Sequence, residues 1–218
     1  MWEQAIVVVI IVLLTGALVG PILAPTQEET PILRLMWLPV YAATMGLLLY
    51  RADRIWRAWP AFLLLGIMVV HAYASKYWSI DPGVTSRRTI ALALSSVFAL
   101  YLGAMFRGPH LPRVLMIACL LMGLGSLVMV FAFTAIGVHQ YDNAGLWRGL
   151  WYEKNQMGVV MVAGVIAATA SLASADNRRV DLWMIASLTA AAVCALLVLA
   201  TQSKTSLLCM IVGVGLIG

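Results

Sequence analysis

Charged residues are scarce in this 218-residue chain: 11% of its positions are Asp, Glu, Lys or Arg, whereas 63% are hydrophobic. A soluble domain of this length has too little interior to bury so much apolar surface. Uncharged stretches of roughly 18 or more apolar residues are typical of membrane spans, and such stretches recur along the chain. The composition therefore excludes a soluble globular protein and predicts a polytopic membrane protein.

The sequence also lacks metal-ligand, redox and nucleic-acid-binding motifs. Cys119, Cys194 and Cys209 lie far apart inside apolar segments without C-x-x-C spacing, which favours small buried hydrophobes over metal or redox roles. The 3 histidines show no H-x-x-x-H spacing. The net charge of +5 is spread over short loops, without the basic tract or aromatic platform that nucleic-acid binding requires. We therefore expect no metal, no cofactor and no nucleic-acid partner.

Apolar runs separated by short polar breaks follow one another along the chain. They predict helices over 5–23, 33–50, 60–74, 89–106, 114–138, 157–175, 182–200 and from 206 onward. The predicted fold class is all-α, a single transmembrane helix bundle over 1–218 with about seven full spans and a truncated eighth. The segment from Ser206 to Gly218 makes only about 20 Å of helix, less than a hydrocarbon core of roughly 30 Å. We therefore expect the chain to be the N-terminal part of a longer fold.

The breaks between the predicted helices are of two kinds, which alternate along the chain. Those at 51–59, 107–113 and 176–181 are short and rich in Arg, whereas those at 24–32, 75–88, 139–156 and 201–205 carry acids, amides and hydroxyls. The 14 Lys and Arg residues divide equally between the two kinds if Arg34 is assigned to the first loop, so the positive-inside rule alone does not decide the orientation. The tight Arg clusters favour the cytoplasm for the first kind. The second kind, here called the polar loops, is predicted to lie on the outer face.

Cations and small polar residues precede each predicted helix that begins on the outer face. Helix N-termini carry partial positive charge and N–H groups without intrahelical partners, and Arg binds phosphate oxygens through paired N–H bonds. This combination predicts an anion-binding site. The competing interpretation is that these side chains only anchor the loops at the membrane interface. The residues concerned are Ser86, Arg87, Arg88, Arg148, Lys154, Asn155, Ser203, Lys204 and Thr205.

Two acidic residues of the polar loops have candidate roles. Asp81, Pro82 and Gly83 predict a structural turn in which Gly83 takes a positive φ, and Asp81 is a candidate partner of one of the two arginines that follow. Glu153 is a candidate general base if it is desolvated near a reacting hydroxyl. The alternative for Glu153 is a solvated ion pair with a neighbouring cation.

Three stretches on the predicted outer face resemble the O-antigen ligase and polymerase superfamily, multi-span glycan-assembly enzymes that include exopolysaccharide polymerases. They are "YWSIDPGVTSRRTI" (77–90), "RGLWYEKNQMG" (148–158) and "TQSKTSLL" (201–208). Similar family stretches read as Trp-Ser-x-x-Pro followed by a basic residue, as Arg-x-x-Gly…Asn-x-x-Gly, and as a Ser-basic-Ser/Thr patch at a helix start. The resemblance covers nearly the whole chain. It departs in the second stretch, where Gly149 directly follows Arg148.

The resemblance implies a substrate, a reaction and a location. An undecaprenyl-diphosphate-linked oligosaccharide would donate its glycan to an acceptor sugar hydroxyl at the periplasmic face of a bacterial inner membrane, without a metal or nucleotide sugar. Carried over by position, Arg148 would contact the diphosphate, with support from Lys154 and Lys204. Asn155 would shape the mouth of its helix. Such cations would stabilise the charge that develops on the leaving diphosphate, and Arg148 and Glu153 are the candidate catalytic residues.

Aromatic residues surround the second stretch. Trp147, Trp151 and Tyr152 are of the kind that forms the aromatic belt at a membrane–water interface. We expect them to keep this stretch at the level of the lipid headgroups, where a prenyl diphosphate would lie.

The family carries further functional Arg and His residues in a large periplasmic loop of its second half, before which this chain stops. If the product ends at Gly218, the resemblance implies little or no transferase activity for the chain alone. Two other classes stay open: a transporter or channel, and an accessory membrane subunit of a polysaccharide export system that works with other polysaccharide-assembly proteins. The spans carry no acid or buried Lys that marks an ion path and show no evident repeat, which counts against a transporter.

Overall fold

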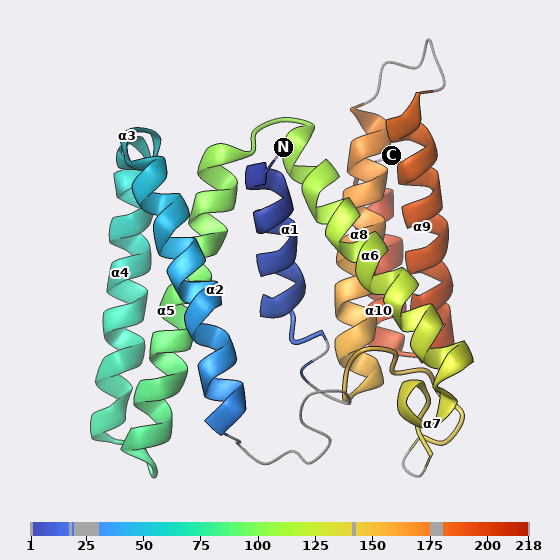
Figure 1. Cartoon of the computed structure of the whole chain (residues 1–218), viewed down its shortest axis with the longest axis horizontal. Coiled ribbons are helices and arrows are strands. Elements are labelled where there is room, and N and C mark those ends of the chain that lie inside the picture. Colours follow the sequence, from blue (N-terminus) through green and yellow to red (C-terminus); the bar gives the residue numbers. More distant parts are fainter. Residues whose placement is uncertain (1, 18, 20–30, 141–142, 175–180, 218) are drawn as a thin grey trace. The chain divides into compact units, whose positions relative to one another are not determined.

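The computed structural model describes residues 2–17, 19, 31–140, 143–174 and 181–217, with the backbone alone at 31–36 (Figure 1). Every regular element in these ranges is a helix, and one isolated antiparallel bridge joins Val138 to Trp147. The chain divides into two compact units. The larger comprises Met1–Met36 and Gly108–Gly218, and the smaller comprises Trp37–Arg107.

Helix length and composition support a membrane helix bundle. The helical segments that are long and apolar enough to cross a membrane are Ala52–Tyr77, Pro82–Met105, His110–Ala132, Lys154–Ala173 and Leu182–Thr201. Shorter apolar helices cover Trp2–Leu14, Trp37–Tyr50 and Lys204–Gly215. The described residues thus contain 5 helices of spanning length, and the prediction of seven full spans with an eighth stays a prediction.

The smaller unit consists mainly of three apolar helical segments joined by short connections. In chain order its elements are α2 (Pro31–Tyr50, from Trp37 onward), α3 (Ala52–Ile55), η2 (Trp56–Ala58), α4 (Trp59–Ala74), η3 (Ser75–Tyr77) and α5 (Pro82–Met105). Most of the predicted Arg-rich loop at 51–59 is therefore helical. α4 and α5 run antiparallel and are in contact, and Thr89 Oγ1 donates to Ala72 O at 3.4 Å between them.

α5 begins at Pro82, well before the predicted start at Thr89. Asp81 is the N-cap of α5, because its Oδ1 accepts from Val84 N at 2.9 Å. Pro82 occupies the first helical position, where the missing N–H has no intrahelical partner to lose. Gly83 lies in the first helical turn and is not among the described glycines with a positive φ. A helix start therefore replaces the predicted turn of Asp81, Pro82 and Gly83.

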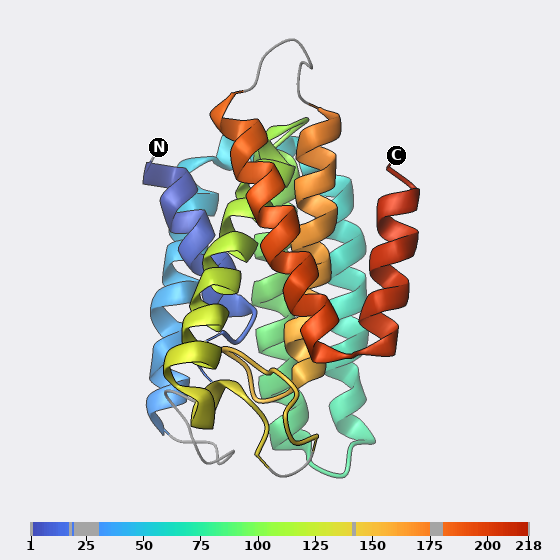
Figure 2. The same ribbon diagram turned by 90° about the vertical axis from the view of Figure 1, so that its right-hand side faces the viewer.

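The larger unit is organised around one central helix. Its elements are α1 (Trp2–Leu14), α6 (His110–Ala132), α7 (Thr134–Gly137), α8 (Lys154–Ala173), α9 (Leu182–Thr201) and α10 (Lys204–Gly215). α8 packs against α6, α9 and α10, while α1 packs against α6 (Figure 2). α1 ends before the predicted boundary at Leu23. Residues 20–30, which hold the rest of that prediction and the acids of the first polar loop, lie outside the described residues.

Small residues allow α6, α8 and α9 to approach one another closely. A Cβ added to Gly164 of α8 would lie 2.7 Å from both Cys119 Cβ and Cys194 Sγ, so that glycine is the only residue that fits without displacing them. Both cysteines are buried, as predicted, whereas the prediction of burial is wrong for Cys209, which is exposed on α10. Close contact through small residues is typical of membrane helices, because lipid provides no hydrophobic force between them. The buried cluster at this contact consists of Met116, Ala167, Ala168 and Ala190.

The two ends of the larger unit carry different segments. α6 and α9 begin at one end, where α8 also finishes (Figures 1 and 2). At the other end α8 and α10 begin, and the described residues of the connection 133–153, which are 133–140 and 143–153, fold against it. The polar loops at 139–156 and 201–205 therefore share this second end, here called the polar end. The Arg178 and Arg179 pair of the predicted cytoplasmic loop at 176–181 lies outside the described residues.

Candidate functional site

The connection 133–153 at the polar end is braced by backbone hydrogen bonds. Gly137 O accepts from Arg148 N at 2.9 Å and from Gly149 N at 3.0 Å. Next to these bonds, His139 N donates to Leu146 O at 3.0 Å. These hydrogen bonds join residues 137–139 to residues 146–149, and Arg148 lies in the second of these two segments.

Arg148 is half-buried and has a fixed orientation. Its Nε donates to Ile136 O, a carbonyl of the short helix α7, at 2.7 Å. A guanidinium carries further N–H donors on its terminal nitrogens, which suit the paired oxygens of a phosphate group. The hydrogen bond to Ile136 therefore orients Arg148, the predicted diphosphate-binding residue. It uses Nε and does not use the two terminal nitrogens, which are the donors that a phosphate group would need.

The backbone conformation and the close packing at position 149 explain why a glycine directly follows Arg148. Its φ is +58°, a conformation that L side chains rarely adopt. A Cβ at this position would lie 2.6 Å from Ser126 Cβ on α6 and 2.7 Å from Met157 Sδ on α8. The spacing that departs from the family pattern is therefore what allows this backbone to fit between two helices.

The aromatic residues of the connection are core contacts more than membrane anchors. Trp151 is only 1% exposed, and its Nε1 donates to Thr15 O just beyond α1 at 2.9 Å. The prediction that Trp151 belongs to an interfacial belt is therefore wrong. Trp147 is half-buried with its ring edge-on to Phe131 at 5.6 Å, and the Oη atom of Tyr152 is buried without a hydrogen-bond partner among the described residues.

α8 begins with polar residues at the polar end. Glu153 is its N-cap, although the Glu153 side chain makes no capping hydrogen bond. Lys154 is half-buried, and Glu153 and Asn155 are exposed. The helix starts at Lys154, earlier than the predicted start at Met157, so the two polar residues lie in its first turn. Their position adds a cation and an amide to the partial positive charge of the helix N-terminus.

The connection between α9 and α10 packs directly on the first turns of α8. Ser203 N donates to Thr201 Oγ1 at 3.2 Å, and Ser206 Oγ donates to Ser203 Oγ at 3.0 Å. All three of these residues are buried. A Cβ added to Gly158 would overlap Ser206 Oγ and would lie 3.4 Å from Thr201 Oγ1. The stretches "RGLWYEKNQMG" and "TQSKTSLL" are therefore in contact, and Gly158 is the residue that permits it.

The structure brings some of the predicted site residues together and separates others. Ser203 is only 6% exposed and is bonded within its own turn, so it stabilises the connection and does not line an open site. Arg87 and Arg88 are exposed on α5 in the smaller unit, so one site shared by all three stretches stays a prediction. Those that share the polar end of the larger unit are Arg148, Lys154, Asn155 and Lys204.

Sequence reasoning missed the buried polar residues that support this end. Ser126 is 0% exposed beside Gly149, and its Oγ has no hydrogen-bond partner among the described residues. Nothing marks Ser126 in the sequence, because it is a single hydroxyl in a long apolar run. Thr201 on α9 and Gly158 on α8 also have no mark in the sequence, because only the structure shows that the two residues lie next to each other.

The polar end holds three of the cations that the sequence predicts for an anion site. Arg148, Lys154 and Lys204 lie next to the starts of α8 and α10, an arrangement that favours a ligand with several negatively charged oxygens. Within the ranges that the structure describes, no three His, Cys, Asp or Glu residues are grouped to hold a metal ion. No family model, no curated protein and no solved structure matches this chain, so the resemblance rests on the three stretches themselves.

Proposed function

We propose that this protein is a membrane glycan-assembly component of the O-antigen ligase and polymerase type. In this proposal it binds the diphosphate of an undecaprenyl-diphosphate-linked oligosaccharide at the periplasmic face of a bacterial inner membrane. The observation that carries the proposal is the contact of "RGLWYEKNQMG" with "TQSKTSLL" through Gly158 and Ser206. Two separate stretches of the resemblance thereby meet at one end of one helix bundle.

The cations of the polar end match the leaving group of the proposed reaction. An acceptor hydroxyl would attack the anomeric carbon, the bond from that carbon to the phosphate oxygen would break, and prenyl diphosphate would leave with the bonding electrons. Arg148, held by Ile136 O, and Lys154 would stabilise the negative charge that develops on the diphosphate. Glu153 is exposed, so it does not meet the desolvation condition for a general base, and the hydroxyl proton would pass to solvent water.

The depth of the polar end also suits a lipid-linked substrate. α8 is a helix of spanning length and begins at Lys154, so in the proposed membrane orientation its first turn would lie where the span meets the headgroup region. A prenyl chain in the bilayer would place its diphosphate at that level. The glycan would then extend into the aqueous phase beside the exposed Lys204.

A binding measurement with a matched charge control tests the proposal. Native mass spectrometry of the purified chain would compare retention of undecaprenyl diphosphate with that of undecaprenyl monophosphate. We expect Arg148→Gln to weaken diphosphate retention about tenfold, since a charged hydrogen bond contributes about 1.5–3 kcal/mol. Arg54→Gln removes an exposed cation from the Arg-rich segment of the smaller unit and should leave retention unchanged.

The same variants should differ in the producing cell. Arg148→Gln is expected to shorten the surface polysaccharide and to accumulate lipid-linked intermediates, whereas Arg54→Gln is not. Both are read from gels of the polysaccharide and from chromatography of extracted lipids. Unchanged diphosphate retention together with unchanged polysaccharide in Arg148→Gln cells would refute the proposed function.

A further inference from the structure

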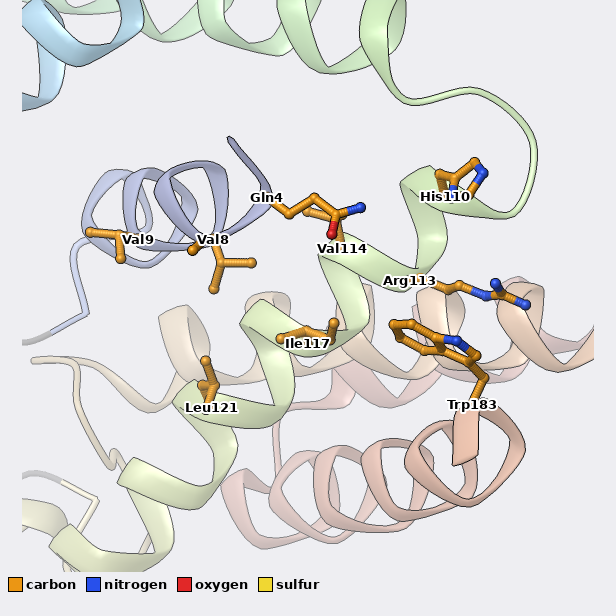
Figure 3. A pocket seen from close by; sticks show the side chains of 10 residues that line it. Gln4, Val8, Val9, His110, Arg113, Val114, Ile117, Leu121 and Trp183 are labelled. Carbon is orange, nitrogen blue, oxygen red and sulfur yellow. The ribbon is translucent and has the colours of Figure 1, made fainter. Parts of the chain in front are cut away.

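A second candidate site lies at the end of the larger unit opposite the polar end. It is a cleft of about 630 Å³ between α1, α6 and the beginning of α9 (Figure 3). None of its lining residues belongs to the three stretches of the resemblance. Those that matter most are Gln4, Val9, His110, Arg113, Ile117 and Trp183.

Polar and apolar groups are separated along the cleft. His110 and Arg113 lie at the start of α6, and Trp183 lies at the start of α9 (Figure 3). Ile117 and Leu121 follow further along α6, and a rise of 1.5 Å per residue places Leu121 about 12 Å beyond Arg113. The cleft thus has a polar mouth and an apolar floor.

Arg113 at the mouth has an unfulfilled hydrogen-bonding group. Its guanidinium carbon lies 4.9 Å from the centroid of the Trp183 ring, an interaction that fixes the plane of the side chain without using its N–H donors. Its Nε is buried and has no hydrogen-bond partner among the described residues. A buried donor without an acceptor costs free energy, so an acceptor at the mouth would be stabilising.

The position of the cleft relative to the bilayer indicates the nature of that acceptor. Arg113 and Trp183 lie in the first turns of two helices of spanning length, and in a bilayer spanned by these helices they would lie at the headgroup level, where Arg and Trp are commonly found. Below them, Leu121 of the spanning helix α6 is 53% exposed. Within a span, apolar side chains with this exposure are covered by lipid acyl chains.

We propose that this cleft is a binding site for an anionic phospholipid. The lipid phosphate would accept from Arg113, beside His110, and one acyl chain would lie over Ile117 and Leu121. Arg suits phosphate oxygens, and an anionic headgroup brings no ammonium to compete with the guanidinium. Because the lipid would touch both α1 and α6, it would also join the two helices at this end. The proposal does not depend on the glycan-assembly function, which concerns the other end.

Lipid selectivity is the property to measure. Native mass spectrometry would compare the retention of phosphatidylglycerol and phosphatidylcholine, offered at equal concentration to the purified chain. We expect the wild type to retain phosphatidylglycerol about tenfold better, and Arg113→Gln to bring this ratio close to one. Arg113→Lys keeps the charge but loses Nε and the planar stack, so its ratio should lie between the two. Arg57→Gln removes an exposed cation elsewhere and should keep the wild-type ratio.

A cavity-filling variant tests the apolar floor. Ile117→Trp should reduce retention of both lipids without changing their ratio, because it blocks the acyl chain and leaves the mouth intact. Helical circular dichroism would verify that each variant is folded, and if Arg113→Gln fails to fold, Arg113→Lys decides. An unchanged ratio in the folded Arg113 variant, or an equal loss in Arg57→Gln, would overturn the proposal. So would undiminished retention in Ile117→Trp, or Arg113-dependent stabilisation by inorganic phosphate alone.

Discussion

The spans that contain α4 and α8 have nearly the same mean hydropathy, 1.6 and 1.8, yet 0% of the first and 50% of the second is buried inside the protein. Their side chains differ in size. α4 carries Leu64, Met68 and Val70, which are 66%, 70% and 68% exposed. α8 carries Gly158, Gly164 and several alanines at its contacts.

The difference in burial shows that hydropathy alone does not tell a helix that faces lipid from a helix that packs against other helices. Apolar content shows that a helix is compatible with a bilayer, whereas small residues show where one helix meets another, because only short side chains permit close backbone approach. α8 is therefore the structural centre of the larger unit, and the outer surface of α4 is suited to contact with lipid. Substitutions at matched positions of the two regions should have very different effects.

The largest contrast is expected between two tryptophans. Trp151→Ala should destabilise the larger unit by about 4 kcal/mol, because it empties a buried site and removes the hydrogen bond to Thr15 O. Trp56, just before α4, is 80% exposed, and Trp56→Ala should change the unfolding free energy little. Unfolding of the detergent-purified protein by chemical denaturant measures both. Equal effects would contradict the assignment of Trp151 to the core.

A second contrast compares two glycines inside spans. Gly164→Leu should cost about 3 kcal/mol, since its side chain collides with Cys119 and Cys194 between three helices. Gly66 of α4 has nothing within 4 Å of an added Cβ, so Gly66→Leu should be nearly neutral. Thermal melting in the same detergent gives the comparison. Tolerance of Leu at 164 would show that α8 is not packed as described.

The smallest contrast concerns two serines. Ser187 Oγ on α9 donates to Ser171 Oγ on α8 at 3.0 Å, and Ser187→Ala should cost about 0.6 kcal/mol, the average for such interhelical bonds. Among the described residues, Ser95 on α5 bonds to two carbonyls of its own helix, at 2.9 and 3.1 Å, so Ser95→Ala should be neutral or slightly stabilising. Replicate denaturant titrations can resolve this difference. A larger loss for Ser95 than for Ser187 would reverse the expected order.

Helix positions could largely be predicted from the sequence, except where one local signal has two meanings. The start of α9 at Leu182 agrees with the prediction, because charged and amide residues give way there to an uncharged and mainly apolar run. Asp81–Pro82 is favourable both in a turn and at a helix N-terminus, and in the structure these residues begin α5. The predicted helix 114–138 breaks at Phe133, with ψ of 55°, inside an apolar stretch where composition gives no sign of a break.

The cations of the candidate site could be predicted from the sequence, but the contacts that position them could not. Arg148 and Lys154 are visible as charges between apolar segments. Their supports are a carbonyl of Ile136 and the close contact at Gly158, and both arise from segments that meet only in three dimensions. Burial of Trp151 was hidden for the same reason, since an interfacial tryptophan and a core tryptophan read alike in a sequence.

The hydrogen bond from Trp151 to Thr15 O has a mechanical consequence. α1 is a short rod that contributes Gln4 and Val9 to the cleft at one end and is followed by Thr15, which meets the polar-end connection at the other. A displacement of the rod at the cleft would be transmitted through Thr15 to Trp151, whose backbone N–H is itself bonded to Arg148 O at 3.1 Å. Lipid bound in the proposed cleft would therefore be connected to the backbone of Arg148 by two hydrogen bonds, Trp151 Nε1 to Thr15 O and Trp151 N to Arg148 O.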